Sequence, residues 1–214
     1  MPDELGFQVI NSPLFLIMEV FKIRQQFSRP VIGNLEQELI SRLESQAGSV
    51  SVGAKIAVAV GSRGIQNLST IVHVVIRYLK QKGALPFIIP AMGSHGGATV
   101  EGQAALLGDY RITEAAMECP IRSDMDVITL PQDGLETPIY MDRLAFDSDG
   151  VVLINRIKAH TDFQGSHESG LVKMSVIGLG KEKQAFEIHR HGIRGLKEFV
   201  PQAARKILSS GKIL

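Results

Sequence analysis

The chain is 214 residues long, with 44% hydrophobic, 21% charged and 6% aromatic residues and a formal net charge of +1. This composition is typical of an ordinary globular protein, and the length allows one large domain or two small ones with a sizeable core. The near-zero net charge and the few aromatic side chains argue against nucleic acid or an anionic membrane as a partner.

The first half of the chain is predicted to alternate strands and helices. Apolar periodicity and breaks at glycine and proline predict six elements here: a strand at Phe15–Phe27, a helix at Leu35–Gln46, a strand at Lys55–Val60, a helix at Leu68–Lys82, a strand at Pro86–Ile89 and a helix at Ala98–Leu107. The apolar run KIAVAV at Lys55–Val60 indicates a strand buried on both faces. Strand, glycine turn and helix occur twice in succession, so we expect an α/β fold with a mainly parallel sheet and flanking helices.

The second half gives weaker patterns and a helical end. The elements expected here are a short helix at Ile112–Met117, strands at Asp126–Leu130, Thr137–Asp142 and Val151–Ile154, and helices at Glu168–Ile177, Lys181–Glu187 and Leu196–Leu208. The final residues, SSGKIL, form an apolar tail after the last helix. We therefore expect a further strand or domain to follow.

The cysteine content and the N-terminal sequence indicate the cellular compartment. The lone cysteine, Cys119, excludes an internal disulfide and a metal site built from cysteines. The N-terminus lacks a basic region followed by a long apolar stretch, and no run approaches the roughly 18 apolar residues of a membrane span. We expect a cytoplasmic protein that contacts no membrane.

Polar, glycine-rich turns follow three of the predicted strands. Gly61–Gly64 follows the first buried strand, and its N–H groups and Arg63 favour a carboxylate or a phosphate, although an ordinary turn with a solvated arginine would have the same sequence. Gly93–Gly97 sets His95 among glycines after the next strand, and the third turn, which holds His160, follows a later strand. Open α/β sheets bind ligands where their strands end, so we expect these three side chains at one edge of the sheet.

The segment Asn155–Gly192 has the densest set of reactive side chains, including four of the six histidines of the chain. Ser169, Gly170 and Lys173 fall in the first turns of a predicted helix, near its positive end, and Ser169 and Lys173 are spaced to share a face. His189 comes at the end of the next helix. A single histidine here would more often be structural, but three converging polar turns favour a functional site.

Together, these segments resemble a known family. GSRG after a strand, MGSHGGAT, and NRIKAHTDFQGSHESGLVKM with the following IGLGK and His189 are similar to the lactate racemase family, the nickel-pincer-dependent 2-hydroxyacid racemases and epimerases. The resemblance covers most of Lys55–Gly192. It implies that residues 1–214 are the N-terminal catalytic and cofactor-binding domain of a longer protein, whose C-terminal domain closes over the cofactor.

The resemblance also implies a cofactor and its protein ligands. A nickel-pincer pyridinium mononucleotide would be attached covalently to Lys173 as a thioamide, and His189 would complete the nickel coordination. Ser62, Ser169 and Gly170, in the turns that favour an anion, are the further cofactor-binding candidates.

For the reaction, the resemblance assigns His95 and His160 as the acid/base pair and places Arg63 close to a 2-hydroxyacid substrate. Racemisation removes a hydride from Cα while a base takes the hydroxyl proton, and it returns both to the other face. Two bases on opposite faces are needed, and imidazole titrates near working pH. No side chain accepts a hydride, so the cofactor must do so.

Two departures leave the substrate open. Family members with racemase activity carry an acidic residue where this chain has Val60, and SGGRK where this chain has SGLVK. A domain that binds a nucleotide or a metal without turnover would use the same turns and histidines. A hydrolase in which Lys173 activates Ser169 is a further alternative.

Overall fold

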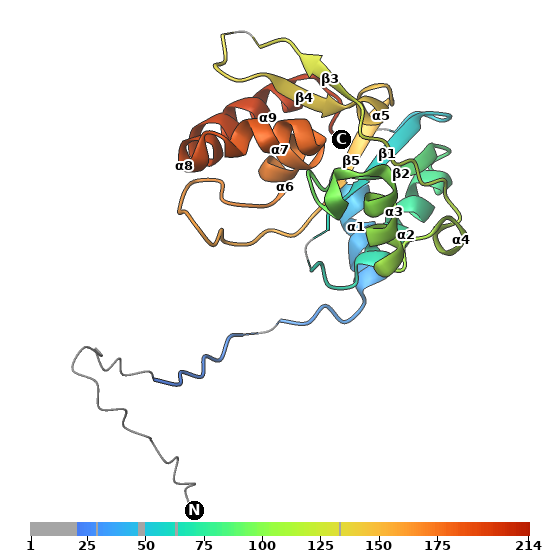
Figure 1. The fold of residues 1–214 in the computed structure, drawn as a ribbon. Helices are drawn as coiled ribbons and strands as arrows, with labels where there is room; N and C mark the ends of the chain where they lie inside the picture. Colours follow the sequence, from blue (N-terminus) through green and yellow to red (C-terminus); the bar gives the residue numbers. More distant parts are fainter. Residues whose placement is uncertain (1–20, 29, 47–49, 63, 133) are drawn as a thin grey trace, which may run out of the picture. The chain divides into compact units, whose positions relative to one another are not determined.

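Figure 1 shows the fold as a computed structural model, which describes residues 21–28, 30–46, 50–62, 64–132 and 134–214. The chain divides into two units, Met1–Gly33 and Asn34–Leu214. All of the predicted functional residues belong to the second unit.

The predicted strand at Phe15–Phe27 is not present in the described part of the first unit. Residues 21–27 form neither helix nor strand, and the side chains of Phe21, Ile23 and Phe27 are exposed. A strand needs a neighbour for its backbone groups, and none of the described strands pairs with this segment. The prediction is therefore wrong over residues 21–27, while residues 15–20 lie outside the described residues.

A three-stranded parallel sheet, in the order β2-β1-β5, organises the second unit. Its strands are β1 (Lys55–Val60), β2 (Leu85–Pro90) and β5 (Gly150–Ile154). Val60 pairs with Pro90 on one side and with Ile154 on the other, so the three strands end level with one another. The predicted α/β fold with a mainly parallel sheet is confirmed, and the turns after all three strands leave from one edge.

Helices cover both faces of the sheet, as Figure 1 shows. One face carries α1 (Leu35–Gln46), α2 (Leu68–Gln81), α3 (Val100–Asp109) and α4 (Glu114–Met117). The other carries α5 (Arg143–Phe146), α6 (Leu171–Lys173), α7 (Lys181–His189), α9 (Val200–Ser209) and two π-helical segments, Met174–Gly178 and Gly195–Phe199; α8 (Gly192–Arg194) leads into the second of these. No helix among the described residues is long and apolar enough to cross a bilayer.

Side-chain alternation along β1 divides the core into two clusters. Ile56, Val58 and Val60 belong to the cluster under α2, and Ala57 and Ala59 belong to the cluster under α7 and α9. All five side chains are at most 2% exposed. Burial of a valine or isoleucine contributes about 1.5–3 kcal/mol, so this strand anchors the edge from which the polar turns leave.

The predicted helix at Glu168–Ile177 begins later than expected, at Leu171. Gly170 has φ 103° and ψ −150°, a conformation that is accessible almost only to glycine. A Cβ at this position would also lie 3.1 Å from Cγ1 of Ile157. The chain therefore bends at Gly170, and Ser169 precedes the helix instead of lying in its first turn.

A small antiparallel sheet of β3 (Val127–Leu130) and β4 (Ile139–Asp142) packs beside the helices of the second face. Asp142, at the end of β4, places Oδ2 2.9 Å from Nζ of Lys181, and the same Nζ donates to the carbonyl oxygen of Pro90 at 2.6 Å. Both charged side chains are almost completely buried. This ion pair joins β4, the start of α7 and the end of β2.

The apolar tail packs against the parallel sheet. Ile213 forms an isolated parallel bridge with Val151, and the N–H of Leu214 donates to the carbonyl oxygen of Val151 at 3.0 Å. The side chain of Leu214 fills the space beside Gly150. The tail therefore lies against the outer edge of β5.

Candidate functional site

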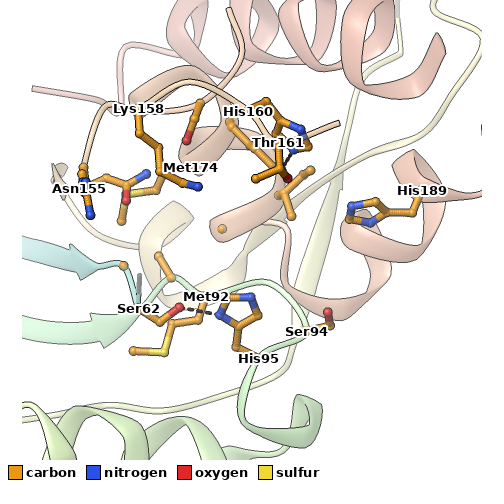
Figure 2. Close-up of a pocket in the computed structure, with 17 residues that line it drawn as sticks. Ser62, Met92, Ser94, His95, Asn155, Lys158, His160, Thr161, Met174 and His189 are labelled. Carbon is orange, nitrogen blue, oxygen red and sulfur yellow. Dashed lines mark hydrogen bonds between the residues drawn. The ribbon is translucent and has the colours of Figure 1, made fainter. Parts of the chain in front are cut away.

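A cavity of about 160 Å³ lies at the edge where β1, β2 and β5 end (Figure 2). The turns after all three strands contribute to it, together with residues before and within α6 and the last residue of α7. Six of the predicted site residues line this cavity: Ser62, His95, His160, Ser169, Lys173 and His189. The fold thus brings together side chains that are far apart in the sequence.

The other two predicted residues are placed differently. Arg63 lies outside the described residues, so its position remains a prediction. Gly170 is buried and does not line the cavity, and its carbonyl accepts a hydrogen bond from Nδ2 of Asn155 at 3.1 Å. Gly170 therefore contributes the bend that leads into α6.

His95 is held through both its ring and its backbone. Its Nδ1 lies 2.5 Å from Oγ of Ser62. Gln103, which is fully buried on α3, donates from Nε2 to the carbonyls of Gly93 at 2.9 Å and of His95 at 3.2 Å. Because Ser62 engages Nδ1, contact between the ring and a bound molecule falls to Nε2.

His160 is held by a backbone group. The N–H of Asp162 donates to Nδ1 of His160 at 3.1 Å, and Nε2 lies 3.1 Å from Nζ of Lys173. A backbone N–H can only donate, so Nδ1 carries no proton and the neutral ring has its proton on Nε2. The ring also packs on Phe163, with centroids 4.5 Å apart. His160 therefore presents Nε2–H toward Lys173.

Glu168 fixes the backbone around His160. Its Oε2 accepts from the N–H of His160 at 2.9 Å, and its Oε1 accepts from the N–H of Gly165 at 3.1 Å. These hydrogen bonds, the one from His160 first, lower the pKa of the Glu168 carboxyl below its ordinary value. The ionised carboxylate is thus the form that closes the segment 160–168 into a loop.

His189 is held through Nδ1 by a backbone carbonyl. Its Nδ1 lies 2.6 Å from the carbonyl oxygen of Ala185, one turn earlier on α7. A carbonyl only accepts, so Nδ1 carries the proton and Nε2 keeps its lone pair. Figure 2 shows the ring beside the cavity. Within the described ranges, no three His, Cys, Asp or Glu side chains are grouped closely enough to hold a metal ion by themselves.

A known family matches more than half of the chain. Its model, described as the lactate racemase N-terminal domain, matches residues 38–198. The chain belongs to the lactate racemase family. The matched region of this lactate racemase family member includes all three polar turns and the six lining residues named above. A comparison with curated proteins found no match.

In this member of the lactate racemase family, the cavity is cationic. Arg156 and Lys158 line it, and no aspartate or glutamate is found among its described lining residues. Arg156 also donates from Nη1 to the carbonyl of Gly64 at 3.2 Å, which links the turn after β5 to the turn after β1. Such a lining suits an anionic ligand, for example a phosphate or a carboxylate.

Among the lining residues of this lactate racemase family site that the sequence analysis did not single out, three lie close together after β5: Asn155, Arg156 and Lys158. The signal was present in NRIKAH, because polar and cationic residues begin where a buried strand ends.

Proposed function

We propose that this chain is the cofactor-binding part of a cytoplasmic 2-hydroxyacid racemase or epimerase, which uses a nickel-pincer pyridinium mononucleotide and couples hydride transfer to proton transfer. One observation carries the proposal: His95, His160, Lys173 and His189 line a single cavity in a chain of the lactate racemase family. A C-terminal domain of the full-length protein would complete the substrate pocket.

The residues present fit this cofactor. His189 offers an unprotonated Nε2, and imidazole is a good nickel ligand. Since the described residues contain no group of three metal-binding side chains, nickel held here would take its remaining ligands from the cofactor. Lys173 supplies the amine for covalent attachment, and Arg156 and Lys158 suit the phosphate of a mononucleotide.

The contact between His160 and Lys173 supports the role of Lys173 as the anchor. An amine attacks through its lone pair. The Nε2–H of His160, 3.1 Å from Nζ, can donate only to such a lone pair. His160 therefore holds Nζ of Lys173 at the cavity, and the electron pair of the amine becomes available for attack when this hydrogen bond breaks.

The chain's own residues would move the proton of the reaction. The cofactor, when bound, supplies the hydride acceptor that no side chain can provide. His95 and His160 follow different strands and approach the cavity from different sides, so one can take the hydroxyl proton while the other gives a proton on the opposite face (Figure 2). Arg63 would hold the substrate carboxylate, as the resemblance implies.

The test uses the full-length protein co-expressed with the enzymes that make the cofactor. Intact-mass measurement, nickel content and a chiral assay of 2-hydroxyacids, beginning with lactate, are compared with the same protein made without those enzymes. We expect an adduct on Lys173, bound nickel and interconversion of two stereoisomers. A protein that forms no adduct when the cofactor is made would contradict the proposal.

A non-catalytic binding domain is the second candidate, and Val60 favours it. Racemases of the family carry an acidic residue at this position, whereas Val60 is apolar, fully buried and paired within the sheet. An adduct and nickel without interconversion of any 2-hydroxyacid would support this candidate. The hydrolase alternative loses the support of helical spacing, because Ser169 precedes α6.

A further inference from the structure

Ser62 and His95 meet across two neighbouring strands. Ser62 follows β1, His95 follows β2, and Oγ of the serine lies 2.5 Å from Nδ1 of the histidine. The strand ends are in register, since Val60 pairs with Pro90. The alignment of two buried strands therefore brings these side chains together.

Helix α3 holds both partners in place. Gln103 donates to the carbonyl of His95 at 3.2 Å, and Tyr110, directly after α3, donates from its hydroxyl to the carbonyl of Ser62. The helix also packs tightly on the His95 turn, because a Cβ on Gly102 would lie 1.9 Å from the carbonyl oxygen of Gly96. Neither partner can move away without disturbing α3.

We propose that Ser62 is the positioning residue of His95. Its Oγ accepts a hydrogen bond from Nδ1–H and so fixes one ring orientation and one tautomer, with an unprotonated Nε2 for the cavity. The hydrogen bond survives proton transfer, because Nδ1–H remains a donor after Nε2 gains a proton. The acid/base role of His95 rests on the proposed function, whereas the contact with Ser62 does not.

The surroundings of His160 favour a different tautomer from that of His95. The Asp162 N–H at Nδ1 leaves the proton of His160 on Nε2, which is the opposite tautomer. In the resting site, His95 then presents a lone pair at Nε2 and can take a proton, whereas His160 presents an N–H group. Ser62 therefore prepares His95 for the role of a base.

The first test is independent of the cofactor. Long-range ¹H–¹⁵N spectra of the histidine rings are recorded on the chain and on Ser62→Ala, Ser62→Thr and Ser94→Ala, with His95→Asn to assign the signals. Ser94 lines the same cavity and serves as the matched control. We expect the Nδ1–H tautomer of His95 in the wild type, Ser62→Thr and Ser94→Ala. In Ser62→Ala, the ¹⁵N chemical shifts of the two ring nitrogens of His95 should approach each other, because both tautomers are then populated.

Two results would overturn the inference: a predominant Nε2–H tautomer in the wild type, or an unchanged His95 spectrum in Ser62→Ala. A second measurement uses the full-length, cofactor-loaded protein. Ser62→Ala should lower kcat about 10- to 100-fold, the usual effect of losing an orienting partner, with KM unchanged and with recovery in Ser62→Thr. A tautomer shift without isomerase activity in the wild type would leave Ser62 as positioning residue and reject the proposed function. Wild-type activity with an unaffected Ser62→Ala would reject only the present inference.

Discussion

His95 and His160 follow the two outer strands of the parallel sheet, β2 and β5, yet the chain holds them by different means. The turn of His95 is fixed by α3, through the buried side chain of Gln103 and through the close approach of Gly96 and Gly102. The segment of His160 has no regular structure and is closed by the carboxylate of Glu168. One histidine is thus positioned by packing and the other by charge.

Because of this difference, the two histidines should respond to different changes in the protein and in the solvent. Packing inside a buried core responds to changes of volume and of buried hydrogen bonds, and it is little affected by pH or salt. A loop closed by an ionised carboxylate responds to protonation of that group. Changes in packing should therefore affect His95 more strongly, and changes in charge should affect His160 more strongly.

The largest effect is expected at Lys173, in α6 beside His160. Lys173→Arg keeps a positive charge but removes the primary amine, so the covalent cofactor should be absent and not merely weaker. Intact mass of the full-length protein gives the answer. His189→Ala is the matched variant, because it should keep the adduct while nickel is lost or loosely held. Covalently attached cofactor on Lys173→Arg would falsify the anchor assignment.

Removal of either histidine should come next. His95→Ala and His160→Ala should both keep cofactor and nickel and should each lower kcat about 10²–10⁴-fold, the range for loss of a general acid or base. The two variants should differ in loading, because Nε2 of His160 lies 3.1 Å from Nζ of Lys173. A time course of adduct formation should be slower for His160→Ala than for His95→Ala. Equal loading rates would remove His160 from the attachment step.

A smaller, local effect is expected from the helix that holds His95. Gln103→Leu removes the buried donor to the carbonyls of Gly93 and His95. The His95 carbonyl still accepts from the N–H of Ala98 at 3.3 Å, so the cost is about 1–3 kcal/mol for the unsatisfied carbonyl of Gly93. Thermal unfolding should show the loss, and the His95 ring signals should shift while those of His160 stay in place. Shifts of similar size in both rings would mean that the two sides are not independent.

The smallest effect, visible only through pH, is expected at Glu168. Its pKa is lowered in the folded state, so its contribution to stability is present above the pKa of the unfolded chain and is lost as pH falls through the folded value. Glu168→Gln should flatten this acid-side loss of thermal stability and loosen the His160 loop, whereas Glu101→Gln on α3 should follow the wild type. Parallel pH curves for wild type and Glu168→Gln would contradict a charge-held loop.

Much of the fold follows from local pattern. The helix Leu35–Gln46 and the strand Lys55–Val60 have the predicted bounds, because their apolar periods are clean and their ends carry polar or glycine residues. The start of α6 was missed, since the φ of Gly170 depends on its contact with Ile157. The π-helical turn at Met174–Gly178 could not be predicted either, because its form depends on tertiary packing. A Cβ on Gly178 would lie 2.8 Å from the carbonyl oxygen of Ala91, which directly follows β2.

The site could be predicted in outline but not in its pairings. Glycine turns after strands were enough to gather His95, His160 and Lys173, because parallel strands end at one edge. The contact of Ser62 with His95 depends on the register of β1 and β2, which no local pattern in the sequence specifies. Short helices such as α5 were missed because one turn gives too little periodicity to detect.

The buried ammonium of Lys181 also constrains the order in which the molecule can fold. It is tied to the carbonyl of Pro90, 91 residues earlier, and to the carboxylate of Asp142. A nascent chain that ends before residue 181 would leave that carboxylate buried without its counter-ion, which costs about 3–5 kcal/mol. The end of β2, which leads into the turn of His95, and the start of the helix that carries His189 are therefore coupled through a single buried ammonium.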